Sequence, residues 1–407
     1  MKKPNLHQTT QAIHLCMLAL VLLSPSIPNG FRAVLYASLL LIPFLFIRTA
    51  PTEHSSFKVW PVLAFLAIPT LYWVWQVYAV APYPIISFKN KIPAVCAIYA
   101  LFCYKYPPQL PLRAYQILLA ISAFPALAWA IYQFVALHDR AQGAGFFSIH
   151  FGDMMALLSL ITIYCSLKEQ RSRCVKLLLI LASFSYLSAS LLSGTRGAWL
   201  AFMVLPLFAL DKEIRKQVFT LGLVVVSCSL LIYSNNTLGI KDRILTAHHE
   251  ISTYSTAEAN LGSSSSGLRL EMWHFASALI SERPFVGWNQ KGYDEQRQIR
   301  IKNGSYSPHI QDFNHAHNDF LNEAAKGGIL GLGTMLLLYM APIIFFWQRY
   351  RRSPQDSEIR IFSAIGLLIP TCFAIFSLTE SLFAWNSAVI TAYFYLLIQF
   401  GAARRLP

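Results

Sequence analysis

Long apolar segments alternate with short polar segments along most of this chain. Each apolar segment has roughly 18 to 25 mostly hydrophobic residues, enough for an α-helix to cross about 30 Å of hydrocarbon. The pattern predicts an all-α polytopic membrane protein with about 12 transmembrane helices. The predicted spans lie near residues 11–30, 33–48, 59–80, 91–104, 114–137, 148–167, 177–193, 196–211, 218–234, 321–348, 361–378 and 383–402. The fourth is short, and the seventh and eighth could form a re-entrant pair instead of two spans.

One long polar segment interrupts this pattern. It divides the chain into nine transmembrane helices in residues 1–234, a large loop in residues 235–320 and three further helices in residues 321–407. Apolar residues recur in the loop at the spacing of one helical face, namely Leu268, Met272, Phe275, Ala276, Leu279 and Ile280. This stripe predicts an amphipathic helix of three or four turns, lying along the membrane surface over the helical bundle.

The positions of Lys and Arg predict the orientation. If the N-terminus is cytoplasmic, the termini and the alternate short loops that share its side hold 19 of the 33 basic residues. Positive residues in short loops are retained in the cytoplasm, whereas long loops do not control topology. We therefore expect both termini to be cytoplasmic and the large loop to face outward.

Composition supports a membrane protein and excludes several other classes. Hydrophobic residues make up 55% of the chain, charged residues make up 13%, and the mean hydropathy is +0.46. The net charge of +14 is spread over loop anchors with no basic stripe, so nucleic acid is not an expected partner. The sequence has no Walker loop, GxGxxG or GxSxG motif, which argues against nucleotide hydrolysis.

Two arginines on the outward side are candidates for binding an anion. Arg196 lies in "LSGTRGAW" between two apolar segments, where Gly194 and Gly197 would let a bulky ligand approach the backbone. Arg269 lies in the first turn of the predicted amphipathic helix. Two guanidinium groups there suggest a phosphate or diphosphate ligand. A snorkelling anchor for Arg196 and a solvated surface charge for Arg269 are the plainer alternatives.

The segment "FNHAHNDFLNEAAKGG", residues 313–328, holds two histidines at the start of an apolar segment. Asn318 or Asp319 can cap the helix that follows, which places His317 just before the positive end of a helix dipole. That field favours a neutral imidazole, the form in which a histidine can act as a general base.

Two other interpretations of the histidines remain open. A hydrogen-bonded loop histidine is the plainest of them. A zinc site built on His315 and His317 would need further ligands, and only Asp312 and Asp319 lie nearby in the sequence. We therefore expect no metal at this position. The glycines of "GGILGLG", residues 327–333, are expected to serve close helix packing.

Together these motifs resemble those of the O-antigen ligase family, which includes O-antigen polymerases and protein O-oligosaccharyltransferases. The resemblance rests on "GTRGAW", "GLRLEMW", "ERPFVGW" and "HAHNDFLNEAAKGGILGLG", within about residues 190–345, and on the topology of the whole chain. It implies a metal-independent, inverting membrane glycosyltransferase of lipopolysaccharide biosynthesis in the bacterial inner membrane. Its site would face the periplasm, its donor would be undecaprenyl diphosphate-linked O-antigen, and no cofactor would be needed.

The resemblance also implies roles for individual residues. Arg196 and Arg269 match the arginines thought to hold the donor diphosphate, and His317 matches the essential histidine. His315 and Asn318 would orient the base or the acceptor sugar, although the roles of the two histidines could be exchanged. Three further cations on outward loops are candidates for binding phosphorylated lipid A-core, the expected acceptor: Lys89, Lys91 and Arg140.

Within the family, the ligase is our first expectation. The chain keeps the HxHN pattern, from which polymerases tend to diverge, and it has no long region after the histidines, as protein transferases usually have. A transporter is the alternative from another class, and it would need charged groups at mid-membrane and broken helices in paired halves. Asp153 and Glu380 are expected to be isolated and near span ends, which disfavours that alternative.

Overall fold

Helices are the only regular elements in the described part of the chain, which confirms the all-α prediction. The computed structural model describes residues 6–47, 71–72, 92–209, 211–220, 222–223, 245, 265–384 and 386–403. The predicted spans near 59–80 and 218–234, and residues 235–264 of the large loop, fall mostly outside these residues. Lys89 and Lys91 also lie outside them.

Among the described residues, six helices are long and apolar enough to cross a membrane: Leu6–Ser26, Leu112–Ala136, Ser148–Lys168, Arg173–Leu192, Asp319–Arg352 and Glu358–Phe376. Four shorter apolar helices accompany them there: Gly30–Phe46, Cys96–Lys105, Gly197–Phe208 and Ile390–Ala402. The chain is a multi-pass membrane protein, and its total of 12 spans stays a prediction.

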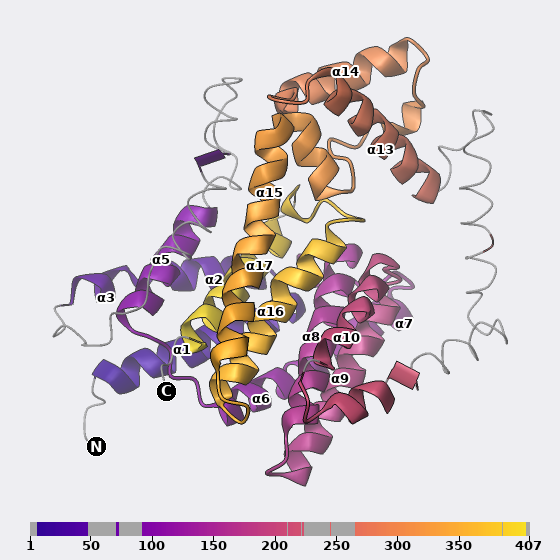
Figure 1. Ribbon diagram of the computed structural model, residues 1–407. Helices are drawn as coiled ribbons and strands as arrows, with labels where there is room; N and C mark the ends of the chain where they lie inside the picture. Colours follow the sequence, from indigo (N-terminus) through magenta and orange to yellow (C-terminus); the bar gives the residue numbers. More distant parts are fainter. Residues whose placement is uncertain are drawn as a thin grey trace.

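The helices form a bundle with a separate pair of helices at one end (Figure 1). The bundle elements are α1 (Leu6–Leu23), α2 (Gly30–Leu39), α3 (Ile42–Phe46), α5 (Ile92–Lys105), α6 (Leu112–Ile121), α7 (Ala123–Ala136), α8 (Ser148–Lys168), α9 (Arg173–Leu192), η4 (Gly197–Val204), α10 (Leu205–Phe208), α15 (Asp319–Arg352), α16 (Glu358–Phe376) and α17 (Asn386–Ala402). Helix α8 packs against α9, α15 packs against α16, and α16 also contacts α8 and η4.

Two predicted spans are broken in the structure. The segment 114–137 divides at Ser122 into α6 and α7, because Pro125 has no N–H to donate to the carbonyl of Ile121. The segment 196–211 is the eight-residue 3₁₀ helix η4 followed by the four-residue α10. Together these are shorter than the roughly 20 residues that a regular spanning helix needs.

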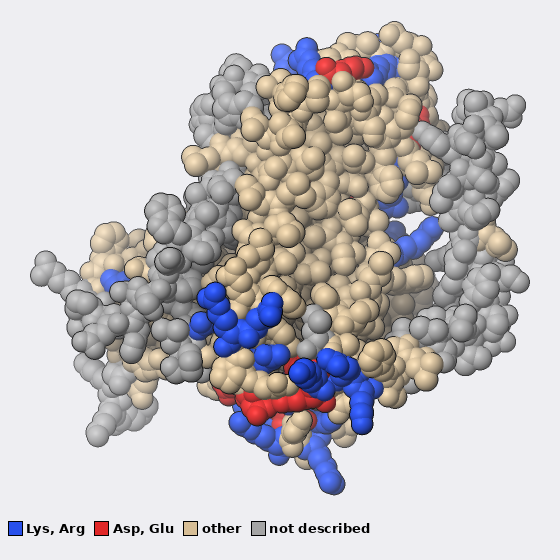
Figure 2. Space-filling view, viewed as in Figure 1, with Lys and Arg blue, Asp and Glu red and all other residues tan. Residues whose placement is uncertain are grey.

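The two ends of the bundle differ in charge. The beginnings of α8 and α15 and the ends of α9 and α16 lie at the end that bears the separate pair of helices. At the opposite end, charged side chains gather in a band (Figure 2). The basic last turn of α15, with Arg349, Arg351 and Arg352, lies at this end, and a buried ion pair of 3.3 Å joins Lys168 to Asp211. This is the distribution from which the sequence predicts that the basic end is cytoplasmic.

The separate pair consists of α13 (Ser265–Glu282) and α14 (Asn289–Lys302), which we call the cap. The predicted apolar stripe of α13 is confirmed, and it packs on α14, on the following loop and on the start of α15. The buried cluster comprises Met272, Phe275, Ala276, Leu279, Tyr293, Ile310, Ala316 and Ala325. Helix α13 is longer than predicted, at 18 residues, and α14 was not predicted.

Glycines join the cap to α15. Gly328 has a φ of 59° and breaks α15, and a Cβ at this position would overlap the carbonyl of Phe285. The amide of Ile329 donates to the carbonyl of Pro284 at 2.8 Å, which ties the α13–α14 turn into the break. At Gly328 the predicted close packing is therefore a contact with a turn instead of another helix, while Gly333 has nothing within 4 Å of an added Cβ.

Candidate active site

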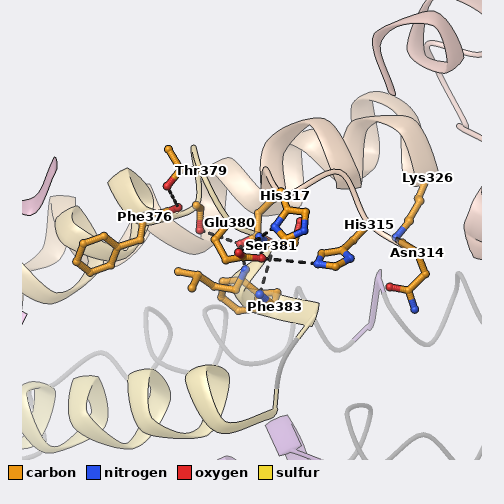
Figure 3. Close-up of polar contacts among 12 residues, drawn as sticks. Asn314, His315, His317, Lys326, Phe376, Thr379, Glu380, Ser381 and Phe383 are labelled. Atoms are coloured by element: carbon orange, nitrogen blue, oxygen red, sulfur yellow. Dashed lines mark hydrogen bonds and ion pairs between the residues drawn. The ribbon is translucent and has the colours of Figure 1, made fainter. Parts of the chain in front are cut away.

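The carboxylate of Glu380 lies between the two histidines (Figure 3). His317 Nδ1 is 2.9 Å from Glu380 Oε2, and His315 Nε2 is 3.6 Å from Glu380 Oε1. The two imidazole rings are 4.4 Å apart between centroids. The Glu380 side chain is 2% exposed and the His317 side chain is 14% exposed, so His317 is the one that a substrate can reach more easily.

Helix capping fixes the position of the histidines. The Asn318 side chain accepts a hydrogen bond from the amide of Leu321 at 3.0 Å, which confirms Asn318 as the cap of α15. Its amide nitrogen also donates to the carbonyl of Leu378 at 3.1 Å. His317 immediately precedes the cap and has a φ of 48°, a conformation that few residues other than glycine adopt. Strain of this kind is found at functional sites.

A buried aspartate fixes the position of Glu380. Asp319 accepts hydrogen bonds from Ser377 Oγ at 2.8 Å and from the amide of Leu382 at 3.0 Å. The amide of Asp319 donates to the carbonyl of Ser377 at 2.9 Å. The loop between α16 and α17 is thus held on both sides of Glu380, and the carboxylate is presented to the histidines by the first residues of α15.

The electrostatics of the cluster define its protonation. Burial raises the pKa of the Glu380 carboxyl, but the contacts with His315 and His317 outweigh burial and hold the pKa below its usual range. Burial lowers the pKa of His315. At neutral pH, Glu380 is therefore an anion that can accept a hydrogen bond from Nδ1–H of His317. In the neutral tautomer that donates from Nδ1, the other nitrogen of His317, Nε2, is an acceptor.

The structure brings both predicted arginines to this cluster. Burial lowers the pKa of Arg269, while the carboxylate of Glu380 opposes that shift and the charge of Arg196 adds to it. Arg269 therefore lies within electrostatic range of both Glu380 and Arg196. The turn that carries Arg196 also contacts the Glu380 loop, since a Cβ on Gly197 would lie 2.6 Å from Thr379 Oγ1.

Arg140 joins the same turn. Its Nε donates to the carbonyl of Ser193 at 2.8 Å, and its guanidinium lies against Gly194, two residues from Arg196. The structure thus places Arg140 beside the predicted diphosphate-binding arginine. Lys89 and Lys91, predicted with Arg140, are outside the described residues.

Two buried polar residues at the start of α8 also belong to this region. His150 and Asp153 are each 3% exposed, and the charge of Glu380 acts on both. The sequence-based expectation that Asp153 and Glu380 are isolated is wrong. Glu380 was missed as a site residue because it is 63 residues from His317 in the chain. An acidic residue in a short outward loop between two apolar helices was the available signal.

The same three side chains could also hold a metal ion. The ligand atoms of His315, His317 and Glu380 lie within 4.8 Å of one another. Two imidazoles and a carboxylate are a common donor set for zinc. The expectation that the histidines lack a third ligand is therefore wrong, because Glu380 comes from a distant part of the sequence.

Comparison with known proteins supports the resemblance. The profile of the family described as O-antigen ligase matches residues 177–336, which contain Arg196, Arg269 and both histidines. A Haemophilus influenzae protein that bears the name "Uncharacterized protein" is 27% identical over 215 residues. That match covers 52% of this chain and 53% of the relative, so the chain aligns with about half the length of that relative. Residues 177–336 therefore match the O-antigen ligase family, which is consistent with the O-antigen ligase and polymerase superfamily.

Proposed function

We propose that this protein is an O-antigen ligase. It transfers O-antigen from undecaprenyl diphosphate to a sugar hydroxyl of lipid A-core on the periplasmic face of the bacterial inner membrane. The observation that carries this proposal is the contact of 2.9 Å between His317 and Glu380, with Arg269 in electrostatic range of the same carboxylate and Arg196 in range of Arg269. The match to the O-antigen ligase family supports the choice of substrates.

The proposed reaction is a single displacement. Nε2 of His317 takes the proton of the acceptor hydroxyl, and the oxygen forms a bond to the anomeric carbon of the donor sugar. The bond from that carbon to the diphosphate oxygen breaks, and its electron pair leaves with undecaprenyl diphosphate. The anomeric centre is inverted. Glu380 holds the imidazole in the tautomer that leaves Nε2 free to accept, and it stabilises the imidazolium that forms.

The arginines serve the leaving group. Arg196 and Arg269 offset the negative charge that builds on the diphosphate as the glycosidic bond breaks. Arg140, which contacts the turn that carries Arg196, remains a candidate for the phosphorylated acceptor together with Lys89 and Lys91. We assign His315 an orienting role, since it lies 3.6 Å from the same carboxylate and is more deeply buried than His317. Asn318 acts mainly by capping α15 and fixing the position of His317.

An in vitro assay distinguishes this function from its alternatives. Purified protein is incubated with undecaprenyl diphosphate-linked O-antigen and rough lipopolysaccharide, and the products are separated by size and by lipid carrier. Transfer to lipopolysaccharide supports the ligase. Lengthening of the glycan on undecaprenyl diphosphate would instead indicate an O-antigen polymerase. Transfer to added protein acceptors would indicate a protein O-oligosaccharyltransferase. Movement of the donor across proteoliposomes without new glycosidic bonds would indicate a transporter.

The role of metal is tested in the same assay. If His317 acts as a base, dialysis against a chelator leaves the transfer rate unchanged. Added zinc then lowers the rate by binding the ring nitrogens of the histidines and the carboxylate of Glu380. Loss of transfer after chelation, restored by one divalent metal, would overturn the base mechanism in favour of metal-assisted activation of the hydroxyl.

A further inference from the structure

The loop that carries the catalytic histidine is held by two buried cations from outside it. We call residues 311–318 the histidine loop. Nη1 of Arg297, on α14, donates to the carbonyl of Phe313. Nζ of Lys326, on α15, donates to the carbonyl of Asn314 at 2.9 Å. Figure 3 shows Lys326 and Asn314 together beside His315. Two successive carbonyls just before the histidines are therefore bound by charged donors.

Both cations are buried, which is unusual for these side chains. Arg297 is 7% exposed and Lys326 is 8% exposed. Arg297 is balanced by Asp294, at 2.9 Å, and Lys326 lies 4.9 Å from the centre of the Tyr293 ring. Burial of a charge is costly unless the charge is compensated. Here the carbonyl groups of Phe313 and Asn314 supply part of that compensation. The two cations therefore favour one conformation of the histidine loop.

The histidine loop has a physical need for such contacts. His317 has a φ of 48°, and a conformation of this kind costs of order 1–3 kcal/mol and persists only where its surroundings hold it. The ring of Phe313 lies 5.3 Å from that of His317, so a shift at Phe313 is passed directly to the imidazole. Arg297 comes from the cap, which links the order of the cap to the position of the base.

We propose that Arg297 and Lys326 are positioning residues that hold the histidine loop so that His317 meets Glu380. They do not touch the reacting atoms and act through the backbone of Phe313 and Asn314. The inference rests on the proposed function for the role of His317, but the conformational effect on the loop does not depend on which glycan is transferred.

The experiment measures the loop and the reaction separately. Arg297→Gln, Lys326→Met, the double variant and the conservative Arg297→Lys are compared with wild type. The matched control is Lys291→Gln, which removes an exposed cation from the same helix. Hydrogen exchange followed by mass spectrometry reports peptides covering residues 311–320, and the transfer assay gives kcat and the KM of the donor.

We expect faster exchange in the histidine loop of Arg297→Gln and Lys326→Met. We also expect a decrease in kcat of about 10- to 100-fold, because displacement of a catalytic group by about 1 Å can cost that much. The donor KM should stay within about twofold, and Arg297→Lys should recover part of kcat. The double variant should be little worse than the worse single variant, since both act on one loop.

Several results would overturn the proposal. If hydrogen exchange in residues 311–320 of the variants equals that of wild type, the proposal fails even if activity falls. It also fails if exchange is faster but kcat stays at the wild-type value. An equal loss in Lys291→Gln would show a general effect of charge on α14. If wild type itself transfers no glycan while the exchange results hold, the proposed function fails and the positioning of the loop stands, so the two failures are distinguishable.

Discussion

Glu380 contacts both histidines, each through a different carboxylate oxygen. Substituting Glu380 tests the orienting role of its charge while His317, the proposed base, stays in place. Glu380→Gln keeps the shape of the side chain but removes the charge that stabilises an imidazolium on His317. We expect the transfer rate to fall by about 10²- to 10⁴-fold, as when the orienting carboxylate of a catalytic triad is neutralised. The measurement is kcat for transfer to lipopolysaccharide. Glu295→Gln, an exposed carboxylate of the cap, is the control, and a rate for Glu380→Gln within threefold of wild type would contradict the orienting role.

The lowered pKa of Glu380 also predicts how stability depends on pH. A carboxyl whose folded pKa lies below its unfolded value, about 4.3, stabilises the fold above that pH and loses this contribution as the pH falls through the folded pKa. The melting temperature of wild type in detergent should therefore exceed that of Glu380→Gln from pH 7 down to about pH 5. The difference should shrink only below about pH 4. A melting temperature of Glu380→Gln that equals or exceeds that of wild type at pH 7 would contradict a stabilising role for the Glu380 carboxylate.

At the scale of elements, the break in α15 is the feature that joins the cap to the bundle. Gly328→Ala would place a side chain at a φ of 59° and against the carbonyl of Phe285. We expect the free energy of unfolding to fall by about 1–3 kcal/mol. Gly333→Ala is the matched control in the same helix, because its Cβ would meet nothing within 4 Å. Melting curves in detergent test this, and equal melting temperatures for the two variants would contradict the account of the break.

The cap shows what the sequence can and cannot predict about an element. The stripe from Met272 to Leu279 has helical spacing, so α13 was predictable. Helix α14 reads "NQKGYDEQRQIRIK", which has too few apolar residues to reveal a buried face, and its buried Tyr293 and Arg297 find partners only in the folded structure. The break at Gly328 was likewise hidden, since its cause is the distant turn at Pro284.

The sequence likewise predicts some residues of the candidate site and not others. Arg196, Arg269 and His317 were predictable because each lies in a short motif with a chemical reason for its residue type. Glu380, His150 and Asp153 were not, because they come from other helices and only tertiary packing places them near one another.

At the scale of the whole molecule, the class and the predicted orientation follow from long apolar segments and from the side on which basic residues gather. Orientation can be tested by labelling single cysteines in a variant whose seven native cysteines are replaced by serine. Ser305→Cys, in the exposed loop after the cap, should react with an impermeant maleimide added to intact spheroplasts. Gln355→Cys, between α15 and α16, should react only after the membrane is opened. The reverse pattern would invert the topology and place the site in the cytoplasm.

The proposed function depends most on His317 acting as the base of a glycan transfer reaction. The most direct measurement is the single-turnover rate of transfer from undecaprenyl diphosphate-linked O-antigen to rough lipopolysaccharide, for wild type, His317→Ala and the neighbouring His315→Ala. All three proteins are first shown to be monodisperse in detergent. We expect His317→Ala to lower the rate by about 10²- to 10⁴-fold, while His315→Ala retains measurable transfer. Transfer by His317→Ala at a rate close to wild type, or loss confined to His315→Ala, would contradict it.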